Sequence, residues 1–483
     1  MKKIFLFLII VLNVSCVFYQ ENEKDIKWKI NFGENKVYLD DDKAEALYYI
    51  KNKEEEEITL KFTSVNQNIE LIYENNKILV NENFNLKISN QENITLKNNG
   101  YEKEYKLSFT TIPIIEINSP NPSDELEKLS LIKIENNPKV PMTMEIRGQT
   151  SAYYPKKPYN IEFLDDDLKD SKNYTLFDMR KDDDWMIDAA YVDKSLIRNR
   201  VSNDLFNEIN ELPYKTKKGK SAIDGKPIEL FLNGNYEGIY ILSEKMDRKL
   251  LDLDKKYGRL YKASSEKLHR NKIYTHFEMK YPKENLQDKG FEELTAMLDS
   301  IKKDGSFDNF EKLFEVEQVI NYHLLLLILS ATDNFEKNYF LAKDEESKFF
   351  FVPWDLDATL GKRFDGVKID EKRWIILPII SEALKSIQYK DLLKKRWDEL
   401  KGNKLSVEYI LEIFDNYYLK LLESGAYQRN YQKWKIEQRG SFDYDFDAKD
   451  IYADEDNYIE DREYIQKWLQ QRYIWLDNKI KGE

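Results

Sequence analysis

The sequence Ala331-Thr332-Asp333-Asn334-Phe335-Glu336-Lys337-Asn338 stands between an apolar segment and two apolar runs of strand length. The segment before it, residues 316–330, is apolar nearly all round and predicts a buried helix. The two runs, residues 338–342 and 349–354, are separated by a polar turn and predict a hairpin. The second run ends at Asp355-Leu356-Asp357, where an extended backbone would put both carboxylates on one face. The sequence therefore predicts a buried helix, a polar loop and a hairpin that ends in two acidic residues.

Asp333 and Asn338 are five positions apart, which is the spacing found in protein-kinase catalytic loops. In such loops the Asp orients the substrate hydroxyl and accepts its proton, while the Asn supplies an oxygen to a magnesium ion. A hairpin follows the kinase loop and ends at a metal-binding Asp, which is the place of Asp355. Asp355 and Asp357 together suit Mg²⁺ or Mn²⁺, which prefer oxygen ligands. The structural alternatives are a capped loop and a turn with surface acids.

Upstream of this loop the pattern predicts two hairpins with a helix between them. The predicted elements are strands 143–147 and 159–163, a helix at 194–209 with Asp193 as its N-cap, and strands 228–232 and 238–242. The Asn233-Gly234 dipeptide indicates a tight turn in the second hairpin. Downstream the pattern is mostly helical, with an apolar stripe along 458–480. This order is two-lobed and typical of protein-kinase folds.

A turn in the amino-terminal half supplies a candidate phosphate site. Arg147, Gly148 and Ser151 lie where the chain leaves a strand, and Lys156 and Lys157 open the next one. A Gly and hydroxyl groups let backbone N–H groups approach phosphate, and a Lys at a strand start can direct its charge to the same oxygens. A surface hairpin with a solvated Lys pair is the alternative.

Several of these stretches together resemble the CotH kinase family. The matching stretches are RGQTS (147–151) with KKPY (156–159), DKSLIRN (193–199), ELFLNGNYEGIY (229–240), DNFEKN (333–338) and WDLDATLG (354–361). They occur in the family's order between about residue 112 and the carboxyl end. The resemblance implies an atypical protein-kinase-like fold that transfers the γ-phosphoryl of ATP to Ser or Thr of a protein with a divalent metal.

The resemblance also implies roles for individual residues. Asp333 matches the catalytic-loop Asp, Asn338 a metal-side residue and Asp355 a metal-binding Asp, whereas Lys156 or Lys157 matches a nucleotide-contacting Lys. Glu244 falls where a kinase-like chain crosses between lobes beside the nucleotide base; an ordinary surface Glu is the alternative. The chain departs from ordinary kinases in lacking a multi-Gly loop and a His-Arg-Asp triplet.

Composition limits the class of protein. The chain has 483 residues, 75 Lys and Arg against 88 Asp and Glu, and a formal charge of −13. This acidic balance argues against a nucleic-acid partner and favours a basic or neutral one. One Cys and three His exclude an internal disulfide and a structural zinc site.

The amino terminus resembles a bacterial lipoprotein signal. Two Lys precede a short apolar run, residues 4–12, and Cys16 follows a small residue. Asn13 departs from the usual Leu three places before the Cys, and an ordinary signal peptide cut nearby is the alternative. We therefore expect a signal peptide at 1–15 and lipidation of Cys16. Alternating short runs with Asn-rich turns then predict a small all-β sandwich-like module at 16–111.

These observations predict an α+β protein with a two-lobed kinase-like domain at 112–483. The leading interpretation is an exported, membrane-anchored lipoprotein kinase at the cell surface or in the periplasm that uses ATP with Mg²⁺ or Mn²⁺. Its partner would be a Ser/Thr-containing, basic protein. Because ATP is scarce outside the cytoplasm, a non-catalytic kinase-like adhesin or scaffold is the alternative. In a third interpretation, Asp355 and Asp357 are the residues of a glycosyltransferase that bind the metal and, through it, the diphosphate.

Overall fold

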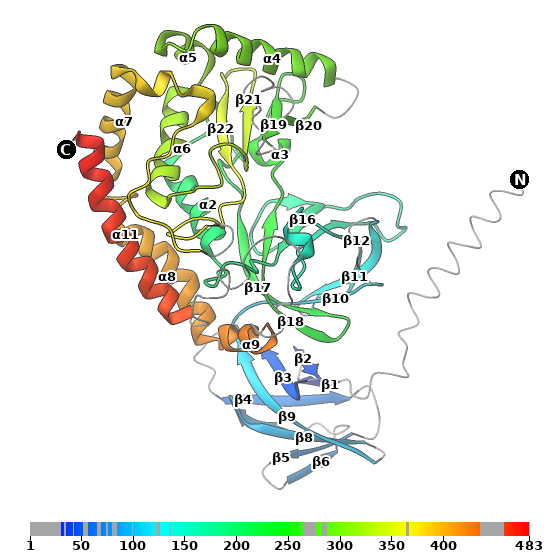
Figure 1. The fold of residues 1–483 in the computed structure, drawn as a ribbon. Helices are drawn as coiled ribbons and strands as arrows, with labels where there is room; N and C mark the ends of the chain where they lie inside the picture. Colours follow the sequence, from blue (N-terminus) through cyan, green and yellow to red (C-terminus); the bar gives the residue numbers. More distant parts are fainter. Residues whose placement is uncertain are drawn as a thin grey trace, which may run out of the picture. The chain divides into compact units, whose positions relative to one another are not determined.

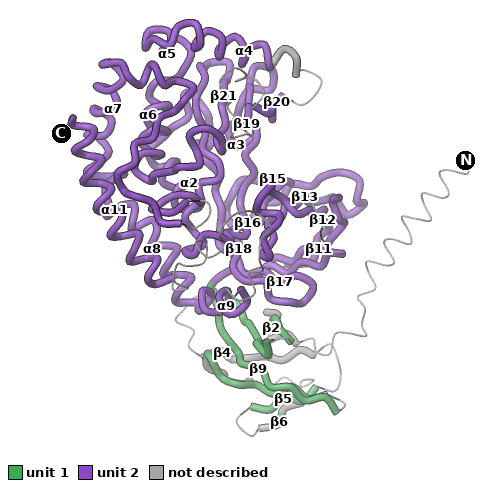
Figure 2. Tube along the Cα trace, in the orientation of Figure 1, with its two compact units in different colours: residues 1–111 green, residues 112–483 purple. Residues whose placement is uncertain are grey.

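The protein, seen in a computed structural model, divides into two compact units, Met1–Thr111 and Ile112–Glu483 (Figure 2). The structure describes residues 30–32, 35–41, 43–51, 57–64, 69–73, 76–79, 85–98, 100–120, 122, 126–135, 137–263, 277–282, 287–363, 367–434 and 458–482. The predicted signal peptide and Cys16 lie outside this part of the chain.

The first unit is a sheet of nine strands in the order β6-β5-β8-β9-β3-β2-β1-β4-β7. Its strands are β1 (Ile30–Phe32), β2 (Asn35–Asp40), β3 (Glu45–Tyr49), β4 (Glu57–Ser64), β5 (Glu70–Tyr73), β6 (Asn76–Leu79), β7 (Asn85–Ser89), β8 (Asn93–Asn98) and β9 (Tyr101–Thr110). The pairs are antiparallel except β3 with β9, which is parallel. Alternate residues such as Ile94 and Leu96 are fully buried, as the period of two predicts. The described residues of this unit lie in strands and in the turns between them.

The second unit begins with a closed barrel in the order β10-β11-β12-β13-β16-β18-β17. Its strands are β10 (Ile114–Asn118), β11 (Lys128–Ile134), β12 (Val140–Ile146), β13 (Tyr159–Phe163), β16 (Asp184–Asp188), β17 (Gly225–Leu232) and β18 (Asn235–Glu244). Both predicted hairpins form, as β12–β13 and β17–β18. Asn233 and Gly234 take φ values of 52° and 83°, as a tight primed turn requires. The barrel closes through parallel pairing of β10 with β17, which the sequence did not predict.

The helix predicted at 194–209 is α2 (Arg198–Ile209), so its predicted start was wrong. Leu196 has a φ of 62°, a left-handed conformation that the first turn of a helix cannot contain. Asp193 is not the N-cap, which is Ile197. The carboxylate of Asp193 nevertheless accepts hydrogen bonds from the backbone N–H groups of Ser195 (2.9 Å) and Arg198 (2.7 Å), and so satisfies a donor at the helix start.

The rest of the second unit combines a four-stranded sheet with helices (Figure 1). The sheet runs β20-β19-β21-β22 and uses β19 (Arg259–Ala263), β20 (Phe277–Tyr281), β21 (Tyr339–Lys343) and β22 (Phe350–Pro353). The helices are α3 (Arg248–Leu251), α4 (Gln287–Lys303), α5 (Phe307–Leu313), α6 (Val316–Leu329), α7 (Ile387–Leu400), α8 (Val407–Glu423), α9 (Ala426–Lys433) and α11 (Tyr458–Lys481). Helices α5, α7 and α8 each begin at a Ser whose side chain accepts a hydrogen bond from the third helical amide.

Helix α6 and the β21–β22 hairpin confirm the prediction made around residues 316–354. Every residue of α6 from Val319 to Leu329 is buried, and Ser330 ends the helix with a φ of 50°. Tyr339 pairs with Pro353 across the hairpin, and α6 packs against β22. The loop 331–338 is therefore held between a buried helix and a buried strand.

None of the helices in the described ranges is long and apolar enough to span a lipid bilayer.

Candidate active site

The loop between α6 and β21 brings Asp333 and Asn338 together. Asn338 has a φ of 56° and its Nδ2 donates to Oδ2 of Asp333 (2.7 Å), so its Oδ1 is the atom that could face a cation. The Nζ of Lys337 lies 3.3 Å from Oδ1 of Asp333. The buried Asn334 fixes the loop, because its Nδ2 donates to the carbonyls of Asn338 (3.0 Å) and Trp354 (2.7 Å). This one side chain therefore joins the loop to the end of β22.

Asp355 and Asp357 follow β22 directly. Asp355 has a φ of 58°, so the backbone there is not the extended chain that would put both carboxylates on one face. Solvent reaches Asp355, yet surrounding protein atoms and the charge of Asp188 raise its pKa, against the opposing effect of nearby cations. Burial and then the charges of Asp355 and Asp188 raise the pKa of Asp357 well above its usual range. A cation bound here would relieve this repulsion.

Two further residues, Asp188 and Asn199, lie beside these carboxylates, and neither had a role predicted from the sequence. Asp188 ends β16, on the barrel, and its charge acts on both Asp355 and Asp357. Asn199, on α2, accepts a hydrogen bond from the backbone N–H of Leu356 (3.1 Å). Its Nδ2 lies 3.4 Å from Oδ2 of Asp188. The only sequence signal was that Asn199 lies in one of the stretches that matched the family.

Two cationic side chains lie near these carboxylates, one from the barrel and one from the four-stranded sheet. The guanidinium of Arg147 lies over the ring of Trp354 at 5.7 Å, and the Nζ of Lys262, on β19, lies 5.6 Å from the same ring. Both cations act on Asp355. Burial and then the charge of Lys280 lower the pKa of Lys262. The sequence predicted Arg147 here but not Lys262, because no strand was predicted at 259–263.

The turn after β12 is compact. Gly148 has a φ of +96°, and a Cβ built there would meet Oγ of Ser151 at 1.9 Å, so only Gly allows Ser151 to pack against this turn. Lys157 donates to the carbonyl of Ala152 (2.7 Å) and so supports the same turn. Gly148, Ser151 and Lys157 thus lie together, next to Arg147.

Lys156 has a different environment. Its side chain is 1% exposed, and its ammonium donates to the carbonyls of Ala189 (2.8 Å) and Ile239 and to Oδ1 of Asn430 (3.3 Å). These bonds account for the three N–H donors of a Lys. Lys156 therefore joins the barrel to α9, whereas the cations that act on Asp355 are Arg147, Lys262 and Lys337.

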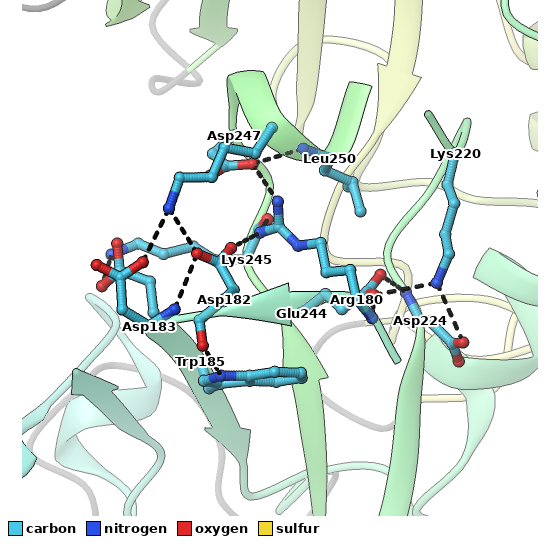
Figure 3. Close-up of polar contacts among 12 residues, drawn as sticks. Arg180, Asp182, Asp183, Trp185, Lys220, Asp224, Glu244, Lys245, Asp247 and Leu250 are labelled. Carbon is cyan, nitrogen blue, oxygen red and sulfur yellow. Dashed lines mark hydrogen bonds and ion pairs between the residues drawn. The ribbon is translucent and has the colours of Figure 1, made fainter. Parts of the chain in front are cut away.

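Glu244 is fully buried at the end of β18, where the chain leaves the barrel (Figure 3). Its carboxylate accepts hydrogen bonds from the backbone N–H groups of Arg180 and Asp224 (both 3.0 Å) and from Nζ of Lys220 (3.0 Å). Arg180 in turn pairs with Asp182 (2.6 Å) and Asp247 (2.7 Å). These bonds anchor the segment that leads from the barrel to α3.

The donor set at Asp355 and Asp357 fits a hard divalent cation bound together with phosphate. Among the described residues, no three Cys, His, Asp or Glu side chains are grouped closely enough to hold a metal alone. Magnesium in phosphoryl-transfer sites does not need such a group, since one or two carboxylates, phosphate oxygens and water complete its octahedron. Asp355, Asp357 and the Oδ1 of Asn338 are the oxygens that would hold it.

Comparison with known proteins gives a consistent assignment. The family described as CotH kinase protein matches residues 144–476. The chain is also similar to the inner spore coat protein H of Bacillus subtilis (strain 168), with 24% identity over 299 residues that cover 57% of this chain and 75% of that protein. The family match includes the loop that carries Asp333 and Asn338, the β21–β22 hairpin and the barrel strands β13, β16, β17 and β18. The chain therefore belongs to the CotH kinase protein family.

Proposed function

We propose that this protein is an ATP-dependent Ser/Thr protein kinase that uses Mg²⁺ or Mn²⁺. The observation that carries the proposal is the grouping of Asp333 and Asn338, on the loop after α6, with the carboxylates of Asp355 and Asp357. Asn334 joins the two segments through hydrogen bonds. A catalytic-loop Asp and Asn beside a second metal-binding Asp is the arrangement that phosphoryl transfer uses in kinases.

In this proposal each side chain has a separate task. Asp333 orients the acceptor hydroxyl and takes its proton, and Lys337, whose Nζ lies 3.3 Å from Oδ1 of Asp333, holds that carboxylate in place. Asp355, Asp357 and Asn338 hold the cation. Arg147 and Lys262 stand where they would balance phosphate charge, and the turn with Gly148 and Ser151 would offer backbone N–H groups. A bound Mg²⁺ or Mn²⁺ would neutralise charge between the β- and γ-phosphates.

The same proposal extends to the architecture. The barrel with α2 would form one lobe and the four-stranded sheet with helices α4 to α11 the other, in a kinase-like arrangement. The nine-stranded first unit would be a sandwich-like spacer or binding module outside the site.

We also propose that the protein is exported and held at the cell surface or in the periplasm by a lipid on Cys16. The relative is an inner spore coat protein by name, which associates this family with a surface layer. Replacing Cys16 with Ala should move the protein from the membrane fraction of its host to the soluble fraction. Retention of Cys16→Ala in the membrane fraction would exclude this anchor.

A non-catalytic scaffold is the second candidate, and one observation favours it. Lys156 and Glu244, two predicted nucleotide contacts, form their hydrogen bonds within the protein. A kinase-like fold that binds a partner without turnover would tolerate this.

Two titrations of the purified protein separate these functions. In one, ATP is added in the presence or absence of Mg²⁺ or Mn²⁺, and in the other, nucleotide sugars are added. Transfer of labelled phosphoryl from ATP to a Lys-rich Ser-containing peptide is then measured, with an acidic peptide as the control acceptor. Metal-dependent ATP binding with transfer supports the kinase. ATP binding without transfer to itself or to either peptide supports the scaffold, and binding of nucleotide sugars alone would support a glycosyltransferase.

A further inference from the structure

One face of helix α11 carries four polar side chains. They contact the segment that comes after the β21–β22 hairpin and after the two carboxylates Asp355 and Asp357. The four are Asp461, Tyr464, Trp468 and Arg472, which recur at intervals of three and four residues and so lie on one face. Their partners lie between residues 361 and 373: Asp461 and Tyr464 contact Lys362 and Gly361, Trp468 contacts Ile369, and Arg472 contacts Glu371 and Arg373. The described parts of this segment, 359–363 and 367–373, contain no regular strand or α-helix. Some of its backbone groups bond to one another, and others are satisfied by side chains from elsewhere in the fold.

Tyr464 and Trp468 contact the two ends of a loop. The backbone N–H of Ile369 donates to the carbonyl of Gly361 (2.8 Å), which brings these two residues side by side. The Tyr464 hydroxyl donates to the same Gly361 carbonyl (2.7 Å), and Nε1 of Trp468 donates to the carbonyl of Ile369 (3.0 Å). Adjacent turns of α11 thus hold both residues of this pair.

Arg472 holds the next part of the segment. Its guanidinium is fully buried and donates to the carbonyls of Glu371 (2.5 Å) and Arg373 (2.7 Å). It also donates to the carbonyl of Leu327 on α6 (2.8 Å). One side chain of α11 therefore joins the segment to the helix that leads into the Asp333 loop.

Asp461 holds the beginning of the segment through two cations. Its carboxylate lies 2.7 Å from Nζ of Lys362 and 2.7 Å from a guanidinium nitrogen of Arg198, and all three side chains are buried. Arg198 also pairs with Asp193 (2.6 Å) and donates through Nε to the carbonyl of Thr359 (3.1 Å). Such a network is costly to break at one member, because a charge is then left buried without its partner.

Thr359 connects this network to residues 355–357, the acidic turn that includes Asp355 and Asp357. Its backbone N–H donates to the carbonyl of Asp357 (3.0 Å), and its hydroxyl donates to the carbonyl of Leu356 (2.9 Å). Ser202 of α2 lies 3.2 Å from the same hydroxyl. The position of Thr359 therefore sets the position of the backbone that carries Asp355 and Asp357.

We propose that α11 is a positioning element for the acidic turn, in which Tyr464 and Asp461 are positioning residues that act on Asp355 and Asp357 through the described residues 359–363 and 367–369. This inference rests on the proposed function in one respect, namely that these carboxylates hold the cation. It adds that the cation site depends on a helix that begins about a hundred residues further along the chain.

Two Tyr residues on α11 allow a matched test. Tyr464→Phe removes the hydroxyl that donates to Gly361 and keeps the ring. Tyr473→Phe removes a hydroxyl on the same helix that donates to the carbonyl of Lys401 (3.1 Å), away from residues 359–369. Both side chains are half-buried, and each variant loses one hydrogen bond to a backbone carbonyl, so similar changes in thermal stability are expected.

The first measurement is backbone amide hydrogen exchange in the full chain. We expect Tyr464→Phe, but not Tyr473→Phe, to speed exchange over residues 359–369, where the amides of Leu360, Lys362 and Ile369 are hydrogen-bonded. This readout needs neither nucleotide nor activity. Equal exchange over these residues in the wild type and Tyr464→Phe would overturn the inference, whatever the protein does.

The second measurement is calorimetric titration with Mn²⁺ and ATP. We expect Tyr464→Phe to weaken metal-dependent ATP binding roughly 3- to 10-fold, the range expected for one hydrogen bond, and Tyr473→Phe to leave it unchanged. An equal loss in both variants would mean that α11 only stabilises the fold. Absence of metal-dependent binding in the wild type would instead refute the proposed function, and hydrogen exchange would still decide the role of α11.

Discussion

At the scale of single residues, the carboxylates of the candidate site differ in their partners. Asp333 has Lys337 at 3.3 Å and a hydrogen bond from Asn338, which fix the direction of its carboxylate. Asp355 and Asp357 instead lie among other acids, and their pKa values are raised first by the surrounding protein and then by neighbouring negative charge. The environment of Asp333 suits a residue that orients a hydroxyl. The environment of Asp355 and Asp357 suits residues that bind a cation.

This difference predicts distinct defects in two variants. Asp333→Asn should reduce phosphoryl transfer by about 10²- to 10⁴-fold and leave ATP affinity nearly unchanged, because nucleotide binding does not use that carboxylate. Asp355→Asn should reduce transfer and also metal-dependent ATP affinity, because a metal ligand is lost. Glu346→Gln, an exposed residue in the turn of the same hairpin, is the control. Equal ATP affinity in Asp355→Asn and the wild type would transfer the metal role to Asp357.

His323 predicts a pH dependence of stability. It is buried in α6, with Nε2 2.9 Å from the carbonyl of Ile375 and Nδ1 2.9 Å from the Tyr389 hydroxyl, so Nε2 donates and Nδ1 accepts. Burial lowers its pKa to about 4 from 6.5. The neutral ring therefore stabilises the fold fully above pH 6.5, and roughly 3 kcal/mol is lost as the pH falls through 4.

Denaturant unfolding at several pH values tests this expectation. His323→Gln should be less stable than the wild type at pH 8, but its free energy of unfolding should fall less between pH 6.5 and 4. Parallel pH curves for the two proteins would show that His323 does not titrate in this window.

At the scale of elements, α11 and the segment after the acidic hairpin meet at Gly361. Gly361 has a φ of +88°, and a Cβ built there would lie 2.7 Å from the Tyr464 hydroxyl oxygen and 2.9 Å from Cγ of Trp468. Gly234, in the β17–β18 turn, has a similar φ of +83° but nothing within 4 Å of such a Cβ. The two glycines thus separate backbone strain from side-chain contact.

We expect Gly234→Ala to cost about 1–2 kcal/mol of unfolding free energy, from the left-handed conformation alone. Gly361→Ala should cost about 1–3 kcal/mol more, because α11 must move to accept the methyl group. It should also weaken metal-dependent ATP binding, as Tyr464→Phe does. The losses of stability are measured by chemical denaturation. Equal losses in the two variants would show that α11 accommodates the methyl group at no cost in free energy.

At the scale of the whole molecule, every candidate site residue that the structure describes belongs to the second unit. That unit has its own buried clusters, one inside the barrel around Trp185 and Leu230 and one around α6. A fragment of residues 112–483 should therefore fold and bind ATP with the affinity of the full chain. Thermal unfolding and calorimetry of both proteins test this. A well-folded fragment that fails to bind ATP would show that the first unit completes the site.

The sequence by itself determined the elements whose signals are local. The buried helix before Asp333, the β21–β22 hairpin and the β17–β18 turn at Asn233-Gly234 follow from apolar periodicity and turn chemistry, and their order, with the motifs, indicated the family. Only the tertiary structure decided what depends on contacts between distant segments. Barrel closure joins β10 to β17, Asp188 and Lys262 come from strands that the sequence did not predict, and α11 contacts residues between Gly361 and Arg373. Lys156 and Glu244 show the physical reason: a polar residue in a sequence does not reveal which buried donor or acceptor will satisfy it, and here protein groups do.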